Sequence, residues 1–414
     1  MSKRCIIVGA SHAAAQLAPA LRQAGWEGEI LVVGDEPYLP YHRPPLSKTF
    51  LSGAKSVEDL FIRPAAFYEK NRVEFRTGRV TAINRAEKTL ELKSGGASGE
   101  ESVETLNYDK LALCTGSRVR KISIPGVELE GVHYLRDIQD VEGMKSGVAE
   151  GKQALIVGGG YIGLETASAL RKLGMQVTVL EMAPRILQRV AAPELSNFYT
   201  RIHTEEGVNI HTNVSVSSIV GDTQVKGVCC TDGREYPADL VVIGVGIVPN
   251  VELAEAAGLA VDNGILVDEY CATSDSDIVA AGDCTNHFNE IYGVRLRLES
   301  VPNASEQGKV AASSLCGVSK AYNSLPWFWS DQYDLKLQIA GLSQGYDQVF
   351  IRGDISQSRS FAAFYFKQGK LISADCVNRP QEFMLSKKLI SQGLEIAPER
   401  LVDESIPVKL LLPV

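Results

Sequence analysis

The sequence predicts an α/β fold with two doubly wound domains, followed by a C-terminal α+β domain. Two observations predict the doubly wound pair: an apolar run, a glycine-rich turn and a helical segment follow one another near the N-terminus, and the same succession recurs in the middle of the chain. A change to short alternating segments from about residue 325 predicts the third domain. We expect domains at residues 1–118 together with 249–324, at 119–248 and at 325–414.

Length and composition exclude several classes of protein. The 414 residues, 45% hydrophobic and 22% charged, predict a globular protein of two or three domains. The net charge of -8 argues against a nonspecific nucleic-acid binder. No apolar stretch reaches the ~20 residues of a membrane helix, and a strand begins too early to leave room for a signal peptide. We expect a cytoplasmic enzyme that binds neither membranes nor nucleic acid.

The 8 cysteines form no recognisable site. None belongs to a Cys-x-x-Cys pair, and none is paired with a histidine at metal spacing, so we predict no bound metal and no disulfide framework. Cys5 and Cys114 lie in apolar runs, where a buried and unreactive thiol is the simpler role.

The first succession occupies residues 3–35. It predicts a strand at residues 4–8, a helix at 13–23 and a strand at 29–33. The turn before the helix is Gly9-Ala10-Ser11-His12-Ala13-Ala14. Because a strand, a Gly-x-Gly-x-x-Gly/Ala turn and a helix together hold the pyrophosphate of a dinucleotide, this segment predicts a dinucleotide site.

Two residues bear on the prediction of a dinucleotide site at this first turn: one departs from the usual pattern and the other supports it. Ser11 stands where the second glycine normally lets the backbone approach the pyrophosphate, although a serine is small and its hydroxyl can bond a phosphate. Asp35 follows the second strand at the distance where an acid holds the ribose hydroxyls. A solvated loop acid is the alternative interpretation of Asp35.

The second succession has the complete pattern, Gly158-Gly159-Gly160-Tyr161-Ile162-Gly163. Its strands and helix are expected at residues 154–157, 176–180 and 163–173. The second strand ends in Glu181, and a carboxylate there bonds the ribose 2′-hydroxyl of NADH and repels the additional phosphate of NADPH. We expect NADH to be preferred, and Arg185 nearby is the feature that weakens this preference.

Two dinucleotide sites in one chain suggest electron transfer between two cofactors, most simply a flavin and a nicotinamide. We predict that FAD binds to the discontinuous domain at 1–118 and 249–324, and that NADH binds to the domain at 119–248.

Three further segments carry candidate site residues. Arg43-Pro44-Pro45-Leu46-Ser47-Lys48 holds two cations on a chain stiffened by prolines, which suits a wall against an anionic group; a basic surface loop is the alternative. Ala280-Ala281-Gly282-Asp283-Cys284 delivers one carboxylate to the edge of a sheet. Glu299-Ser300-Val301-Pro302-Asn303-Ala304 begins a helix whose N–H groups can face flavin oxygens. The remaining cofactor-binding candidates, which follow apolar runs, are Thr115, Gly116 and Gly246.

Other elements follow from pattern alone. The polar stretch 93–104 predicts a hairpin connection, and residues 240–245 predict a buried strand. In the third domain, alternating segments predict strands at 336–340, 348–352, 362–366 and 371–374, with a helix at 379–391.

These residues resemble the FAD-dependent, NADH-consuming ferredoxin reductases of bacterial oxygenase systems, the family of the putidaredoxin, biphenyl dioxygenase and toluene dioxygenase reductases, which has the glutathione-reductase type of fold. The resemblance covers essentially the whole chain. It runs through residues 43–48, 158–165, 281–284 and 299–304, and through the specific segment Trp327-Phe328-Trp329-Ser330-Asp331-Gln332-Tyr333.

The resemblance implies a role for each matching position. Those expected to contact FAD away from its reactive edge are Ala13 and Asp35 (adenosine half), Val80 (adenine), Arg136 (phosphate side), Asp283 (ribityl chain) and Val301 (flavin ring). Lys48 would reach the isoalloxazine, Glu165 would pair with Lys48 near flavin N5, and Trp329 would cover the flavin. A lysine there stabilises the anionic reduced flavin, and a carboxylate keeps that lysine charged. The alternatives are a helix-surface acid for Glu165 and a plain core residue for Trp329.

Disulfide reductases of this fold pass electrons to a cysteine pair, and related enzymes keep a single cysteine, where this chain has residues 38–53. No cysteine occurs in that stretch. We therefore expect NADH to reduce FAD by hydride transfer and the flavin to reduce, by single electrons, a 2Fe–2S ferredoxin that feeds a monooxygenase or ring-hydroxylating dioxygenase. The alternatives are a rubredoxin reductase and an NADH-dependent flavin reductase or oxidase acting on a small molecule; a redox-sensing interaction protein is a rival from another class.

Ferredoxins are commonly acidic and so is this chain, so the net charges of the two predicted partners would repel each other. A local cationic patch can guide docking. Lys309 is the leading candidate, with Arg295 and Arg297 behind it. Scattered surface charge without a docking role is the alternative.

Overall fold

The computed structural model describes residues 3–95 and 101–412. The chain divides into two compact units, each made of three separate stretches. Unit 1 comprises Met1–His42, Leu60–Arg118 and Val248–Pro326, and unit 2 comprises Arg43–Asp59, Val119–Ile247 and Trp327–Val414. Strands β8 (Ser117–Val119) and β17 (Ile247–Pro249) lie where the chain passes from one unit to the other. The three-domain division expected from the sequence stays a prediction.

A five-stranded parallel sheet forms the centre of unit 1, in the order β19-β7-β1-β2-β3. Its strands are β1 (Arg4–Val8), β2 (Glu29–Gly34), β3 (Val73–Thr77), β7 (Lys110–Leu113) and β19 (Ile278–Ala280). Most of its strand residues are buried, and in β1, β2 and β7 they form the continuous apolar runs of a sheet covered on both faces. The strands predicted at residues 4–8 and 29–33 are confirmed, and β2 extends one residue further.

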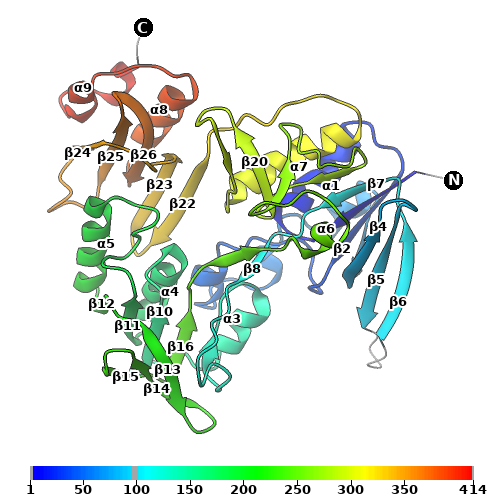
Figure 1. Cartoon of the computed structure of the whole chain (residues 1–414). Helices are drawn as coiled ribbons and strands as arrows, with labels where there is room; N and C mark the ends of the chain where they lie inside the picture. The colour runs from blue at the N-terminus through cyan, green and yellow to red at the C-terminus, as the bar shows by residue number, and fades with distance from the viewer. Residues whose placement is uncertain (1–2, 96–100, 413–414) are drawn as a thin grey trace. The chain divides into compact units, whose positions relative to one another are not determined.

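Helices α1 (His12–Gln23) and α7 (Val301–Leu315) cover one face of this sheet and share its core. They approach closely at Gly308, where a Cβ would lie 2.6 Å from the carbonyl oxygen of Ala13. The other face packs against an antiparallel sheet of β4 (Arg79–Asn84), β5 (Thr89–Gly95) and β6 (Glu101–Asn107) (Figure 1). The pairing of β5 with β6 confirms the predicted hairpin, although residues 96–100 lie outside the described residues.

Smaller elements complete unit 1. They are η2 (Glu58–Leu60, at the boundary between the units), α2 (Ala65–Lys70), α6 (Glu252–Ala256), β18 (Ile265–Val267), β20 (Thr285–Asn289) and β21 (Val294–Leu296).

Unit 2 contains a second parallel sheet, in the order β12-β11-β10-β16-β9. Its strands are β9 (Val132–His133), β10 (Gln153–Val157), β11 (Gln176–Glu181), β12 (Val208–Thr212) and β16 (Leu240–Ile243). Its helices are the π-helix η1 (Leu46–Phe50), α3 (Ile138–Lys145), α4 (Tyr161–Lys172) and α5 (Pro193–Glu205), and the hairpin sheet beside it is β13 (Val216–Gly221), β14 (Val225–Cys230) and β15 (Glu235–Pro237). The predicted strand at 240–245 is two residues too long, since β16 ends at Ile243 and Gly244 already lies against the first glycine of the dinucleotide motif, Gly158.

The C-terminal part of unit 2 is an antiparallel sheet in the order β22-β23-β26-β25-β24, with helices beside it (Figure 1). Its elements are β22 (Trp327–Gln332), β23 (Leu335–Gly341), β24 (Gln348–Arg352), β25 (Phe361–Lys367), β26 (Lys370–Val377), α8 (Pro380–Ser391), α9 (Pro398–Val402) and η3 (Val408–Leu410). The predicted α+β character is confirmed. This sheet shares one hydrophobic core with α4 and α5, which joins it to the parallel sheet in one unit.

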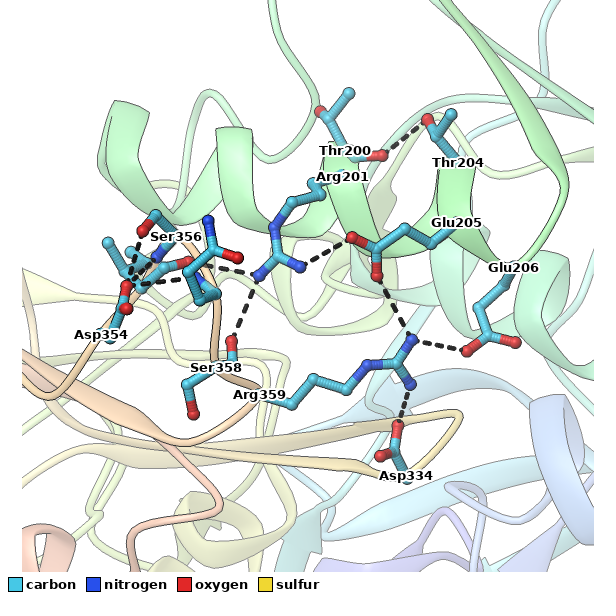
Figure 2. A network of polar contacts seen from close by, with 12 residues as sticks. Thr200, Arg201, Thr204, Glu205, Glu206, Asp334, Asp354, Ser356, Ser358 and Arg359 are labelled. Atoms are coloured by element: carbon cyan, nitrogen blue, oxygen red, sulfur yellow. Dashed lines mark hydrogen bonds and ion pairs between the residues drawn. The ribbon is translucent and has the colours of Figure 1, made fainter.

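An ion-pair network also links α5 to the C-terminal sheet, and Figure 2 shows it. The guanidinium of Arg359 lies 2.8 Å from Glu206, 3.5 Å from Glu205 and 2.6 Å from Asp334. Arg201 on α5 bonds Glu205 and the backbone carbonyl oxygens of Ile355 and Ser358.

None of the helices in the described part of the chain is both long enough and apolar enough to cross a membrane.

Candidate functional site

The first glycines of the two predicted motifs occupy equivalent positions. Gly9 follows β1 with φ +107°, and Gly158 follows β10 with φ +112°. A Cβ would lie 2.1 Å from the carbonyl oxygen of Cys114 at the first and 2.4 Å from that of Gly244 at the second. Both positions therefore require glycine for two reasons. The backbone has a positive φ, and the end of the neighbouring strand is too close to leave room for a side chain.

The second motif leaves a cradle in front of a helix. Gly160 caps the N-terminus of α4, and a Cβ there would meet nothing within 4 Å. A Cβ at Gly163 would lie 2.2 Å from the carbonyl oxygen of Gly158, so this glycine allows the helix to pack on the strand. The open approach to unsatisfied helix N–H groups suits a pyrophosphate. Tyr161 and Ile162 begin the helix, two residues earlier than predicted, and Ile162 is exposed.

The first motif builds the same turn with larger residues. Ser11 caps α1, and Ala14, which corresponds to Gly163, is buried against the core. His12 and Ala13 are also buried in the first turn of the helix. The absence of the second glycine therefore leaves the strand–turn–helix geometry intact.

Glu181 lies beside the second motif and is bound to it. Its Oε2 accepts the N–H of Gly159 at 2.7 Å, and its Oε1 accepts the N–H of Ala183 at 2.8 Å. Arg185, which the sequence left as a competing influence, donates instead to the carbonyl oxygen of Ala191 and to Ser196 Oγ. Its guanidinium is thus hydrogen-bonded to residues that follow it in the chain.

In unit 1 most of the predicted FAD residues meet at one edge of the parallel sheet. Residues 9–14 follow β1, Asp35 follows β2, Thr115 and Gly116 follow β7, and Asp283 follows β19. The carboxyl ends of parallel strands lie at the same edge, so the topology brings these segments together. Val80 is buried in β4 and Val301 opens α7.

Hydrogen bonds fix this edge. Thr115 Oγ1 donates to the carbonyl oxygen of Asn250 at 2.7 Å, and Asn250 Nδ2 donates to that of Thr115 at 2.8 Å. Ser117 Oγ donates to Asp283 Oδ2 at 2.8 Å. Gln307 Oε1 accepts the N–H of Gly282 at 2.8 Å, which holds the turn before Asp283 in place.

In unit 2 the structure joins Lys48 to Glu165. Lys48 Nζ lies 2.6 Å from Glu165 Oε2, and the side chains are 19% and 3% exposed. Glu165 is therefore not a helix-surface acid. Ser47 Oγ donates to the same carboxylate oxygen at 2.8 Å, and Ser330 Oγ donates to Oε1 at 2.7 Å.

A π-helix presents both donors from the Arg43–Lys48 segment. The N–H of Phe50 bonds the carbonyl oxygen of Pro45 at 2.9 Å, five residues back, which is the π-helical spacing. Pro45 is the residue before this turn, and its ring fixes the backbone there. Lys48 Nζ also donates to the carbonyl oxygen of Pro44 at 3.2 Å.

The other predicted residues of unit 2 lie in ordered surroundings. Arg43 donates to the carbonyl oxygen of Arg136 at 2.8 Å, and the N–H of Arg136 bonds Asp140 at 2.7 Å. Gly246 has φ +106° after β16. Trp329 lies on β22 with its ring centroid 5.6 Å from that of Trp327.

Sequence reasoning did not identify Ser330 or Gln332 as part of this site. Both are buried and lie two residues apart on β22, so they face the same side of the strand. The polar alternation within an otherwise aromatic segment was the available signal.

Comparisons with known proteins identify the family of the chain. Residues 3–308 match the family model described as pyridine nucleotide-disulphide oxidoreductase, and residues 327–412 match the model described as reductase C-terminal. The chain belongs to the pyridine nucleotide-disulphide oxidoreductase family. Within this family it is 42% identical to putidaredoxin reductase CamA from Pseudomonas putida, over 98% of this chain and 96% of that protein.

Two further relatives extend the comparison. The chain is 39% identical to rhodocoxin reductase from Rhodococcus erythropolis, over 98% of this chain and 94% of that protein. The solved structure of the covalent putidaredoxin reductase–putidaredoxin complex aligns with a TM-score of 0.93 at 41% identity, covering 99% of this chain and 98% of the matched chain. This family membership confirms the resemblance and the expected fold.

Proposed function

We propose that this oxidoreductase takes hydride from NADH onto FAD and passes single electrons to a 2Fe–2S ferredoxin that serves an oxygenase. The observation that carries the proposal is the buried Lys48–Glu165 pair in a chain with two dinucleotide motifs. Relatives matched over more than 90% of both chains are named putidaredoxin reductase and ferredoxin–NAD(P)+ reductase, which supports the same partner class.

The described residues fit both cofactors. The carboxyl edge of the unit 1 sheet offers a helix N-terminus and the carboxylates of Asp35 and Asp283, which suit the pyrophosphate and hydroxyls of FAD. The open space at Gly160 and the carboxylate of Glu181 suit NADH in unit 2. When bound, FAD supplies a ring that accepts a hydride and gives up electrons one at a time.

The protein's own groups supply charge and position. Lys48 carries the cation that favours an anionic reduced ring, and Glu165 with Ser47 holds the ammonium in place. We assign the remaining predicted residues the roles that the family resemblance implies, with Trp329 covering the flavin.

The segment that provides Lys48 offers electrons no thiol exit. Residues 38–53 contain no cysteine, and all 8 cysteines of the chain lie in the described part and are free. Burial raises the pKa of Cys114 and Cys284, the two that flank the carboxyl edge of unit 1, so neither forms a thiolate readily. This favours direct transfer to an external acceptor.

For docking we propose Lys309 on α7, in a cytoplasmic protein. Lys309 is exposed, with its Nζ 3.3 Å from Glu306. The two other candidates are more constrained: Arg295 donates to the carbonyl oxygens of Val267 and Asn286, and Arg297 pairs with Glu299 at 2.5 Å.

An anaerobic assay tests the function. The purified protein, loaded with FAD, is mixed with NADH or NADPH, and flavin bleaching is followed before addition of 2Fe–2S ferredoxins, rubredoxin, a quinone or oxygen. We expect bleaching by NADH and electron transfer to at least one ferredoxin. A protein that cannot be loaded with FAD would refute the proposal, and faster reduction of rubredoxin or of a small acceptor would establish the corresponding alternative.

A further inference from the structure

The carboxylate of Glu165 is the end of a longer buried line of hydrogen bonds in unit 2. Ser330 Oγ, which bonds Glu165 Oε1, lies 3.1 Å from Gln332 Nε2. Gln332 Oε1 lies 2.8 Å from His203 Nε2, and His203 Nδ1 lies 3.1 Å from the hydroxyl of Tyr333. Ser330, Gln332 and His203 are each at most 1% exposed.

The chemistry of these groups sets the direction of the line. Burial lowers the pKa of His203 to about 4, so the ring carries one proton at neutral pH. Burial raises the pKa of Tyr333, so its hydroxyl stays protonated and can donate to Nδ1. His203 then donates from Nε2 to Gln332, the Gln332 amide donates to Ser330, and Ser330 donates to Glu165.

If the hydrogen bonds ran in the opposite direction, from Glu165 toward Tyr333, one contact would have no proton to share. If His203 carried its proton on Nδ1, Gln332 would turn its amide nitrogen toward His203 and its oxygen toward Ser330. Ser330 would then face two acceptors, Gln332 Oε1 and Glu165 Oε1, with one proton to give. A buried acceptor would lose its hydrogen bond, which is costly where water is excluded. The ionised Glu165 and the direction that runs from Tyr333 to Ser330 therefore require each other.

Helix α4 holds both ends of the line. Glu165, Ser168 and Lys172 lie on one face of the helix, at spacings of three and four residues. Ser168 Oγ accepts the N–H of Tyr333 at 2.9 Å, and Lys172 Nζ donates to the carbonyl oxygen of Tyr333 at 3.0 Å.

Tyr333 itself has an unusual backbone. It is the first of two residues in the turn between β22 and β23 and has φ +54°, a conformation for which glycine or asparagine is usual. Such strain persists where surrounding contacts over-determine it, and it clusters at functional sites. The tyrosine hydroxyl is the feature that glycine would lack, and it bonds His203.

We propose that Ser330, Gln332, His203 and Tyr333 are positioning residues, which fix Glu165 as a carboxylate directed at Lys48. The inference rests on the function proposed above, in which Lys48 stabilises the reduced flavin. The residues that hold the Glu165 carboxylate therefore lie on the C-terminal sheet and on α5, far in sequence from both cofactor motifs.

The first test uses the FAD-loaded full chain with Gln332→Met, which keeps the volume and removes both hydrogen bonds. We expect hydride transfer from NADH, measured by stopped-flow, to slow about tenfold, because, of the two lost bonds, only the one to Ser330 acts on Glu165. The affinity for NADH is expected to stay unchanged, and the midpoint potential of the flavin to become more negative, because a loosely held Lys48 stabilises the reduced ring less.

Matched variants control for packing. Asp331→Asn changes the exposed neighbour on the same strand and is expected to leave rate and potential unchanged. Ser330→Ala is expected to reproduce the effect of Gln332→Met, and Ser330→Thr, which keeps the hydroxyl, to restore wild-type values. A wild-type potential in both Gln332→Met and Ser330→Ala would overturn the proposal.

The second test needs no variant. Nitrogen-15 NMR of the histidine rings in the wild-type protein is expected to show His203 neutral, with its proton on Nε2, from pH 5 to 8. A proton on Nδ1 would refute the line. Failure of the proposed function has a different signature: a wild-type flavin that NADH does not reduce, with the His203 tautomer still as expected.

Discussion

The ammonium nitrogen of Lys48 lies 2.6 Å from Glu165 Oε2 in a place where water reaches neither group freely. Breaking such a pair leaves an uncompensated buried charge and costs more than the pair itself contributes. We expect Lys48→Met to lower the free energy of unfolding by about 3 kcal/mol. The double variant Lys48→Met/Glu165→Gln is expected to recover most of this loss in urea unfolding; additive losses would contradict the interpretation.

The same pair gives a kinetic prediction. Lys48→Met is expected to slow flavin reduction by NADH about 10- to 100-fold, the range for losing a charge-assisted contact. Lys152→Met removes an exposed lysine of the same unit and serves as the control. Equal rates in the two variants, measured anaerobically at saturating NADH, would show that the cation at position 48 has no part in the reaction.

We predict that coenzyme selection depends on Glu181 rather than on Arg185. Glu181→Gln removes the negative charge that repels the phosphate of NADPH, and we expect the ratio of kcat/KM for NADH to that for NADPH to fall about tenfold. Arg185→Gln is expected to leave the ratio unchanged and to lower the Tm, because this guanidinium holds the loop at Ala191 and Ser196. A changed ratio in Arg185→Gln would reverse the assignment.

Asp375 couples stability to pH. This buried carboxyl accepts one hydrogen bond, from Tyr365 at 2.6 Å, and burial raises its pKa from the ordinary range of an aspartate, about 4, to about 7. The folded state therefore keeps a proton that the unfolded state loses. The stabilisation from Asp375 is complete below pH 4 and is lost as the pH rises to 7, about 4 kcal/mol in all.

Asp375→Asn tests this coupling, since it removes the titration and keeps an acceptor for Tyr365. Relative to wild type, the variant is expected to gain stability steadily from pH 4 to pH 7 in denaturant unfolding. Tyr365→Phe is expected to shift the transition to higher pH, because its hydroxyl is the group that lowers the pKa of Asp375. A stability difference independent of pH would refute the prediction.

The ion pairs of Figure 2 predict a salt-dependent contribution to stability. Three carboxylates surround Arg359, and two of them, Glu206 and Asp334, raise its pKa; these groups are partly exposed. We expect Arg359→Gln to lower the free energy of unfolding by about 1 kcal/mol at low salt and by less at high salt. Arg234→Gln, which removes a local pair with Asp232, is expected to have a smaller effect. A loss unaffected by salt would point to packing instead.

Docking of an acidic ferredoxin is expected to respond in opposite directions at two neighbouring positions. Lys309→Gln should slow association at low ionic strength, and Glu306→Gln should accelerate it, since Glu306 neutralises Lys309. Both effects are expected to fade with added salt. Lys320→Gln, which changes an exposed lysine beyond α7, is the control. Unchanged ferredoxin reduction in Lys309→Gln at low salt would exclude this residue from docking.

Local chemistry explains what the sequence could predict. Gly9 and Gly158 are required by their own backbone angles and by the strand beside them, so each motif specifies its turn without knowledge of the rest of the fold. The carboxyl edge of the unit 1 sheet then follows from topology, because every parallel strand ends there.

Contacts between distant segments explain what the sequence could not predict. Ser330 is separated from Glu165 by 165 residues and Ser47 by 118, and no periodicity joins them. Helix α5 was not predicted, although Pro193 stands at its first position. Its packing against the C-terminal sheet depends on side chains such as Phe198 and Phe361, whose rings meet at 4.8 Å only after folding.

The π-helical turn at Leu46–Phe50 restricts how this segment can change its length. A π-turn holds one residue more than an α-turn, and here the additional residue lets Ser47 and Lys48 reach the same oxygen. Deleting a single residue would restore ordinary helical register and swing one of the two side chains about 100° away. We therefore expect functional members of the family to show no deletion of even one residue in this segment, although the segment has little regular structure around it.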